Sequence, residues 1–220
     1  MSRSALTKRN MLALSLGIFF DALGVALVTK SDFGISAVSS VAYVLSRVFP
    51  AMTFGMWSYT YQFFLFVLMC GLVRRCSAGY AISFLVGIVF GYTLDFCRFF
   101  VNCLPLGALL RILYFVLGTA VLIAGVAFLM ISNMPIMPQD LFTRELSAHF
   151  SLPFKRVKTM FDLFCVAFSL AVSVCALGRA AGLGAGTLVS ALITGRCVDW
   201  IKERLLSTKM FGPDCRRGET

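Results

Sequence analysis

The sequence predicts an all-α, polytopic membrane protein with about six spanning helices and two short amphipathic or re-entrant helices, arranged as two inverted repeats. Three observations predict this fold class. The 220-residue chain is 59% hydrophobic and only 14% charged, with a mean hydropathy of +0.88, whereas a soluble domain needs a more charged surface. Long apolar segments divide the chain, and its two halves resemble each other.

Six apolar segments are long enough to cross about 30 Å of hydrocarbon, which takes about 20 helical residues. In chain order they are Met11–Thr29, Phe54–Val73, Tyr80–Phe100, Leu110–Ile131, Val157–Leu177 and Leu183–Ile201. The first run lacks the small-residue cleavage site of a signal peptide, so we interpret it as a structural helix.

Two shorter helices are predicted at Ser36–Phe49 and Gln139–Phe150, after the first and fourth apolar segments. At 1.5 Å per residue they would reach about 18–21 Å, too little to cross the bilayer unaided. If both crossed nevertheless, the chain would have eight spans. Helix length favours six.

An internal repeat relates the two halves. A shift of 101 residues superimposes Leu12–Pro50 on Leu113–Ser151 with eleven identities in 39 positions, among them two pairs of glycines. We assign residues 1–101 to the first repeat, 110–206 to the second, and 207–220 to a basic cytoplasmic tail of a single membrane domain. Three spans per repeat would give the halves opposite orientations, as in many secondary transporters.

The charge distribution predicts the topology. With the N-terminus inside, fourteen basic residues fall on the cytoplasmic side and five outside, namely Lys30, Arg47, Arg98, Arg111 and Arg179. This bias favours cytoplasmic N- and C-termini. It also accounts for the net charge of +10 without a nucleic-acid partner, so the lipid bilayer is the expected partner, and a homo-oligomer is compatible with the sequence.

No enzyme, cofactor or metal site is predicted. The eight cysteines form no CxxC pair and lie mainly in apolar segments, so we expect buried thiols. His149 is the only histidine. Met130, Met134 and Met137 are expected to fill irregular space rather than to bind a soft metal.

Ionisable residues inside a membrane are costly and prompt functional hypotheses. Asp21 lies near the middle of the first predicted span, where it is either functional or a protonated or paired carboxyl. Asp162 lies one turn after Lys158, which predicts an i, i+4 ion pair. Its repeat partner is the polar Gln62, so we also predict a shared site near the pseudo-symmetry axis where Asp162 exchanges a proton.

A Gly-x-x-x-Asp-aromatic-x-basic pattern occurs twice, as Gly91…Asp95…Arg98 and as Gly195…Asp199…Lys202. The spacing allows each aspartate to pair with the basic residue three positions on, and each glycine to admit a neighbouring helix. A structural role is favoured. Asp21, Asp32, Asp95 and Asp199 are therefore structural or coupling candidates.

The two short helices carry polar stripes at helical spacing. The first stripe consists of Ser36, Ser39, Ser40, Tyr43 and Ser46, and the second of Gln139, Asp140, Thr143, Arg144 and Ser147. Such stripes are typical of a solvated interfacial face, of helix capping, or of a polar cavity that both helices face. For the cavity, the substrate-binding candidates are Ser39, Gln62, Asp140, Arg144 and Asp162.

The segments Lys30–Ser36 and Thr53–Ser58, together with Gly91, Asp95, Gly182–Thr187 and Gly195, resemble the YczE/YyaS/YitT family of bacterial integral membrane proteins, in particular its YczE-like branch. The resemblance implies a location in the bacterial inner membrane and no catalytic residues. The Met-Pro-Ile-Met-Pro run at 134–138 departs from the Gly-containing echo of the first break that this family would suggest.

The expected function is therefore that of a small secondary-type transporter or exporter of an unidentified small solute, with a midplane site between the repeats. The alternative is a non-transporting membrane scaffold, regulator or substrate-capturing subunit of a larger complex. Stable co-purification of a partner would favour the alternative, and coupled charge movement would favour the transporter.

Overall fold

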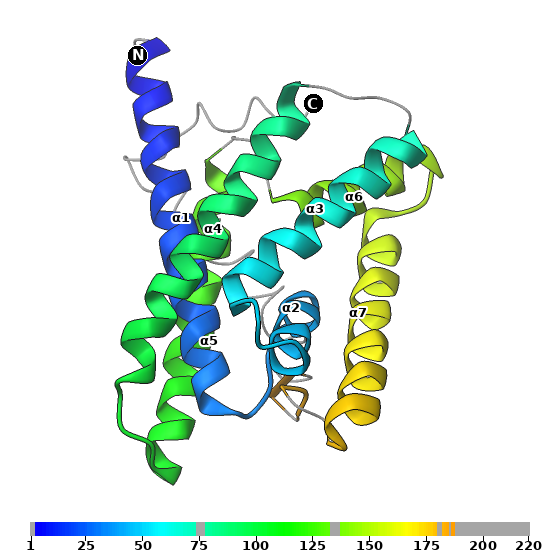
Figure 1. Cartoon of the computed structure of the whole chain (residues 1–220). Helices are drawn as coiled ribbons and strands as arrows, with labels where there is room; N and C mark the ends of the chain where they lie inside the picture. Colours follow the sequence, from blue (N-terminus) through cyan, green and yellow to red (C-terminus); the bar gives the residue numbers. More distant parts are fainter. Residues whose placement is uncertain (1–2, 74–77, 133–136, 180–181, 185, 188–220) are drawn as a thin grey trace.

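The computed structural model describes residues 3–73, 78–132, 137–179, 182–184 and 186–187, and this part of the chain consists of helices joined by short connections, without a strand (Figure 1). Its helices are α1 (Arg3–Ser31), α2 (Ala37–Val48), α3 (Phe54–Val73), α4 (Ala78–Asn102), α5 (Ala108–Ile131), α6 (Pro138–His149) and α7 (Phe154–Leu177). The all-α class is confirmed, and both short helices exist with twelve residues each.

Four of the described helices are long and apolar enough to cross a membrane, which identifies the chain as a multi-pass membrane protein. These candidate spans are Lys8–Ser31, Ile82–Asn102, Ala108–Ile131 and Arg156–Leu177, and they coincide with four of the six predicted spans. Helix α3 is not among them, and its first half carries Ser58, Thr60 and Gln62. The predicted span Leu183–Ile201 lies almost wholly outside the described residues.

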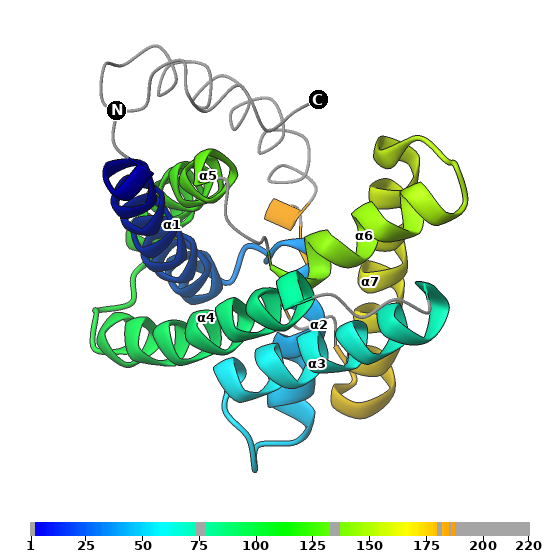
Figure 2. The same cartoon turned by 90° about the horizontal axis from the view of Figure 1, so that it is seen from above.

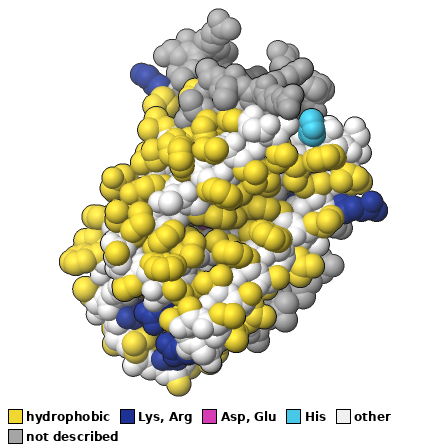
Figure 3. All heavy atoms as spheres, turned by 45° about the vertical axis from the view of Figure 1, so that its right-hand side comes forward, with side chains coloured by type: hydrophobic (Ala, Val, Ile, Leu, Met, Phe, Trp, Pro, Cys, Tyr) yellow, Lys and Arg dark blue, Asp and Glu magenta, His cyan; other side chains and the backbone are white. Residues whose placement is uncertain are grey.

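The outer surface of the bundle is apolar. Phe64, Phe99, Leu109 and Leu163 are each more than 60% exposed, and hydrophobic side chains cover most of the face in Figure 3, with Lys and Arg near its margins. Exposing this much apolar surface to water would be unfavourable, whereas a hydrocarbon environment accommodates it. The exposed aromatic and aliphatic side chains therefore fit a lipid-facing surface.

Helices α1 and α5 form the tightest pair, and they run antiparallel. Moving towards the C-terminus of α1, the facing residues move back along α5: Gly17 lies against Leu129, Gly24 against Leu122, Asp21 against Gly125, and Val28 against Gly118. The four glycines are the two pairs that the internal repeat aligns. Glycine lets two helix backbones approach closely, so the repeated glycines have a packing role.

The remaining helices lie mainly to one side of this pair and join it through α4 (Figure 2). Helix α4 contacts α1 and α3. The short helix α2 contacts α7 and α3, and the short helix α6 contacts α3, α7 and α4. A continuous core includes Ala22, Ala42, Phe54 and Leu94, all at most 2% exposed. Of the three methionines predicted to fill irregular space, Met137 belongs to this core, Met130 is 49% exposed, and Met134 lies outside the described residues.

The start of α3 is held by α4. The carboxylate of Asp95 accepts a 2.8 Å hydrogen bond from the backbone N–H of Gly55 and another from the hydroxyl of Thr53. Gly91 and Gly55 touch through their backbones, which confirms the predicted close approach at Gly91. In contrast to the prediction, Asp95 does not pair with Arg98 in the described part of the chain, because its carboxylate accepts from the N–H of Gly55, an orphan donor in the first turn of α3, and from the hydroxyl of Thr53.

The cysteines follow the prediction only in part. Cys97 and Cys165 are buried, but Cys103 and Cys175 are exposed near the ends of α4 and α7. An exposed thiol at a helix end is the residue that a thiol reagent would reach first.

Candidate functional site

A cluster of charged side chains joins α6 to α7. The ammonium group of Lys158 lies 3.1 Å from the carboxylate of Asp140 and 3.5 Å from that of Asp162. The predicted pair between Lys158 and Asp162 is thus confirmed, and Asp140 in the first turn of α6 is its third member. Two carboxylates share one ammonium, so the cluster carries a net negative charge when all three groups are ionised.

Two further polar side chains of the predicted site are buried in other long helices, Asp21 in α1 and Gln62 in α3. Asp21 is only 8% exposed, and it lies against Gly125 of α5. Gln62 is 1% exposed, donates a 3.3 Å hydrogen bond to Ser58, and has no partner for its Oε1 among the described residues. Its amide oxygen packs towards Gly87 of α4, beside Pro138 at the start of α6.

Further polar contacts line the interior between α2, α3 and α7. The hydroxyl of Tyr61 lies 3.3 Å from the thiol of Cys165, and the hydroxyls of Ser40 and Ser169 share a hydrogen bond of 2.9 Å. Ser40 and Ser169 are at most 1% exposed. A buried side-chain pair of this kind, from helices far apart in the chain, fixes α2 against α7.

The other predicted binding residues lie elsewhere. Ser39 shares a 3.0 Å hydrogen bond with Ser36, and Arg144 is exposed and forms a 3.5 Å ion pair with Glu145 on its own helix. Ser40 and Thr143 are 0% exposed, so these two stripe positions are core positions rather than parts of a solvated face. Ser40 of the first stripe contacts Ser169 of α7 rather than the second stripe on α6. This contact does not support a cavity that both stripes face.

The first polar break meets a glycine-rich segment of the second half. The N–H of Ile35 donates to the carbonyl of Gly182, and the N–H of Gly186 donates to the carbonyl of Phe33, both at 2.9 Å. A Cβ at Gly34, whose φ is +136°, would lie 2.5 Å from the hydroxyl oxygen of Thr187. Only glycine suits this backbone conformation and close approach. Two segments that carry the family resemblance therefore form one structural unit.

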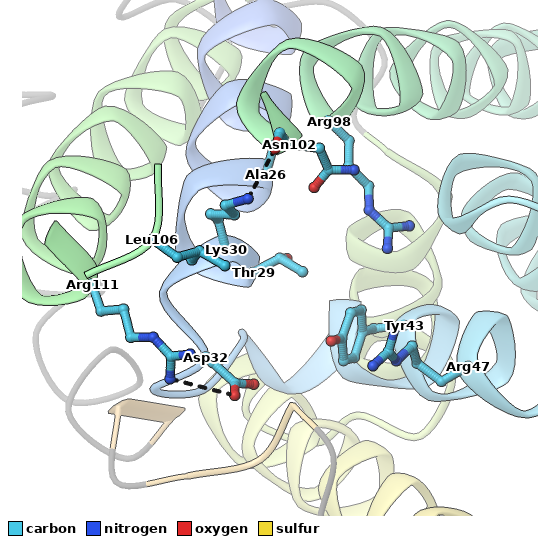
Figure 4. A pocket seen from close by; sticks show the side chains of 10 residues that line it. All are labelled: Ala26, Thr29, Lys30, Asp32, Tyr43, Arg47, Arg98, Asn102, Leu106 and Arg111. Atoms are coloured by element: carbon cyan, nitrogen blue, oxygen red, sulfur yellow. Dashed lines mark hydrogen bonds and ion pairs between the residues drawn. The ribbon is translucent and has the colours of Figure 1, made fainter. Parts of the chain in front are cut away.

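A basic cavity of about 260 Å³ lies at the end of α1, between α2, α4 and the start of α5 (Figure 4). Its lining includes four cationic side chains and one anionic side chain, namely Lys30, Arg47, Arg98, Arg111 and Asp32, together with the hydroxyl-bearing Thr29 and Tyr43. Lys30 donates a 3.0 Å hydrogen bond to the carbonyl of Asn102, and Arg111 lies 3.9 Å from Asp32.

Sequence reasoning missed this cavity, although one signal pointed to it. The four cationic lining residues are four of the five basic residues that the topology prediction places outside. Shared sidedness brings residues to one end of a bundle, but it does not say that they meet. Of the structural or coupling candidates, Asp32 lines the cavity, Asp95 caps α3, Asp21 lies against α5, and Asp199 falls outside the described residues.

Comparison with known proteins identifies one family. No curated protein and no solved structure matches the chain. A family of unknown function, DUF6198, matches residues 8–203, which is most of the chain. The protein therefore belongs to the DUF6198 family.

Proposed function

We propose that the protein is a small secondary-type transporter built from two inverted repeats, with α3 and the segment Leu183–Ile201 completing six spans. The observation that carries this proposal is the reciprocal packing of α1 and α5. Gly17 of α1 contacts Leu129 of α5, and its repeat equivalent Gly118 of α5 contacts Val28 of α1, which is itself the repeat equivalent of Leu129. Such reciprocity is what a two-fold axis between antiparallel equivalents would produce.

The short helices support the same arrangement. Under an exchange of repeats, α2 is equivalent to α6 and α3 to α7. The contact between α2 and α7 is then equivalent to the contact between α6 and α3, and both contacts exist. A scaffold that evolved for a single static surface has no need of such an exchange, whereas alternating access uses two equivalent halves that rock against each other.

The charged cluster supplies the centre for the coupled step. Asp21 lies against Gly125 where α1 and α5 pack together, and Lys158 links Asp140 to Asp162. Buried carboxylates in a membrane protein mark ion or proton pathways. Binding a proton or a small cation at Asp21 or Asp162 would neutralise a carboxylate, which would couple the uptake of that ion to rearrangement of α1, α6 and α7.

We also propose a location in the bacterial inner membrane with cytoplasmic termini. The resemblance to the YczE/YyaS/YitT family and the excess of basic residues on one predicted side support it. The gathering of Lys30, Arg47, Arg98 and Arg111 at one end of the bundle agrees with their common placement on the opposite, outer side.

The test is electrogenic or proton-coupled movement in proteoliposomes. Purified wild-type protein and the variant Asp21→Asn are reconstituted at equal density, and currents are recorded on a supported membrane after concentration jumps of candidate solutes and of protons. We expect solute-dependent currents in the wild type that Asp21→Asn reduces at least about tenfold. A folded wild-type protein that yields no current with any solute, and that purifies with a stoichiometric partner, would favour the non-transporting subunit instead.

A further inference from the structure

We infer that the basic cavity between α1, α2, α4 and α5 binds a small soluble anion that carries two or more phosphate or carboxylate groups. This inference names a substrate class for the proposed transporter and rests on that proposal for the role of the cavity in transport. The binding itself can be tested without any transport.

The charge of the cavity favours a multivalent anion. Lys30, Arg47, Arg98 and Arg111 contribute four positive charges, and Asp32 contributes one negative charge. Asp32 and Arg111 are 3.9 Å apart and exposed, so their pairing is weak. A net charge of about +3 within one small cavity repels itself, and a bound anion would neutralise it.

Two guanidinium groups that line the cavity stack on aromatic rings. Arg98 lies over the ring of Phe54 at 5.5 Å, and Arg47 lies over the ring of Tyr43 at 6.0 Å. Stacking fixes the plane of a guanidinium but leaves its in-plane N–H donors available for oxyanions. Among the described residues no carboxylate pairs with Arg47 or Arg98, which distinguishes them from Arg111.

The side chains converge from different helices. In Figure 4, Arg98, Tyr43 and Arg47 lie on one side of the cavity, and Lys30 and Thr29 of α1 lie on the other. A ligand between them would meet two guanidinium groups, one ammonium group and the hydroxyl of Tyr43, whereas the hydroxyl of Thr29 already donates a 2.7 Å hydrogen bond to the carbonyl of Val25. Arginine forks bind carboxylates and phosphates in a bidentate manner, so the arrangement suits an anion with acidic groups at more than one end.

The size of the cavity limits the ligand. Its volume of about 260 Å³ is below the range of about 300–1,000 Å³ that is usual for drug-sized ligands. Inorganic phosphate, pyrophosphate and a tricarboxylate such as citrate are small enough to lie within this volume.

The experiment titrates these three anions, as sodium salts, into the purified full-length protein in a zwitterionic detergent, by calorimetry at constant ionic strength. We expect at least one anion to bind to the wild type. Arg47→Gln and Arg98→Gln should each weaken binding at least about tenfold, because each removes charge-assisted hydrogen bonds. Arg98→Lys should retain part of the affinity, since it keeps the charge but loses the fork.

Arg179→Gln is the matched control, because it removes the same charge near the end of α7 without touching the cavity, and it should change the affinity less than about twofold. Arg47 is exposed, so Arg47→Gln keeps the test valid if Arg98→Gln fails to fold. Binding of none of the three anions, or equal weakening by all the glutamine variants, would overturn the inference.

A second arm repeats the titration in nanodiscs of phosphatidylcholine with and without phosphatidylglycerol. Affinity that is unaffected by phosphatidylglycerol supports a soluble anion. If phosphatidylglycerol displaces the anion from the wild type but not from Arg47→Gln, the cavity binds a lipid headgroup, and the inference of a soluble anionic substrate is overturned. If the anions bind through Arg47 and Arg98 but never cross proteoliposomes, the transport proposal fails and the site stands. If a solute is transported but the anions do not bind, the site fails and the transport proposal stands.

Discussion

Adding one methyl group between α1 and α5 should destabilise the protein. A Cβ at Gly24 would lie 2.5 Å from the backbone nitrogen of Leu122, and a Cβ at Gly125 would lie 2.8 Å from the Cα of Asp21. Both obstacles are backbone atoms, which cannot rotate away as a side chain can. Gly24→Ala or Gly125→Ala therefore requires the two helices to separate locally by about 1 Å to restore a normal contact of about 3.5–4.0 Å.

The cost follows from that separation. A gap of about 0.5–1 Å forfeits roughly a quarter to a half of the dispersion energy of each affected contact, and overpacking typically costs about 1–3 kcal/mol. Alanine's better helix propensity returns about 0.5–1 kcal/mol in a soluble helix, which is less than the loss. For a chain of this size the net change should lower Tm by roughly 2–8 °C.

The measurement is thermal unfolding in detergent with a thiol-reactive fluorophore: Cys103 and Cys175 are exposed and set the baseline in the folded protein, and the rise above it reports exposure of the buried Cys97 and Cys165. Gly71→Ala is the control, because a Cβ at Gly71 meets no atom within 4 Å, and it should leave Tm unchanged or raise it. The double variant Gly24→Ala/Gly125→Ala should cost less than the sum of the single variants, since the first methyl already separates the helices. A Tm for Gly24→Ala and Gly125→Ala that equals that of Gly71→Ala would refute the close packing of α1 and α5.

Three further predictions concern other contacts. Asp95→Asn should destabilise the protein by about 0.5–2 kcal/mol through loss of the charged cap on α3, while anion binding stays within twofold; loss of binding at unchanged Tm would make Asp95 a ligand instead. Lys158→Gln should cost about 1–3 kcal/mol and more than Asp162→Asn, because it leaves two neighbouring carboxylates without their shared cation, and equal Tm values would contradict the shared pairing. An impermeant maleimide should label native Cys103 from outside and an introduced cysteine at His149 from the cytoplasmic side; the reverse pattern would reject the predicted topology.

The sequence predicted those parts of the fold that depend on local patterns. Apolar length located four candidate spans, and the interruption of apolar runs located α2 and α6 within one or two residues of their observed ends. The repeated glycines were visible as identities between the halves, and the structure gives them a role that the shift alone could not, because a repeat does not say which helix each glycine faces.

Contacts between distant side chains could not be predicted in the same way. The spacing of Asp95 and Arg98 allowed an i, i+3 pair, but the start of α3 offers backbone N–H groups that a local pattern cannot anticipate. Asp140 joined the predicted pair of Lys158 and Asp162 because α6 folds back onto α7. The basic cavity likewise depends on how four helix ends meet.

The two halves match where they hold the scaffold and differ where charge is buried. Gly24 of α1 and Gly125 of α5 are equivalent positions of the two halves. The residues that they face are also equivalent but differ in charge: Gly125 faces Asp21, whereas Gly24 faces Leu122. The repeat likewise pairs the uncharged Gln62 with Asp162, which lies beside Lys158. Two identical charged halves would place like charges near the axis, at a high cost in a membrane. Each half therefore contributes one carboxyl at a position where the other half has an uncharged side chain, so that carboxylates do not stand at equivalent positions of both halves.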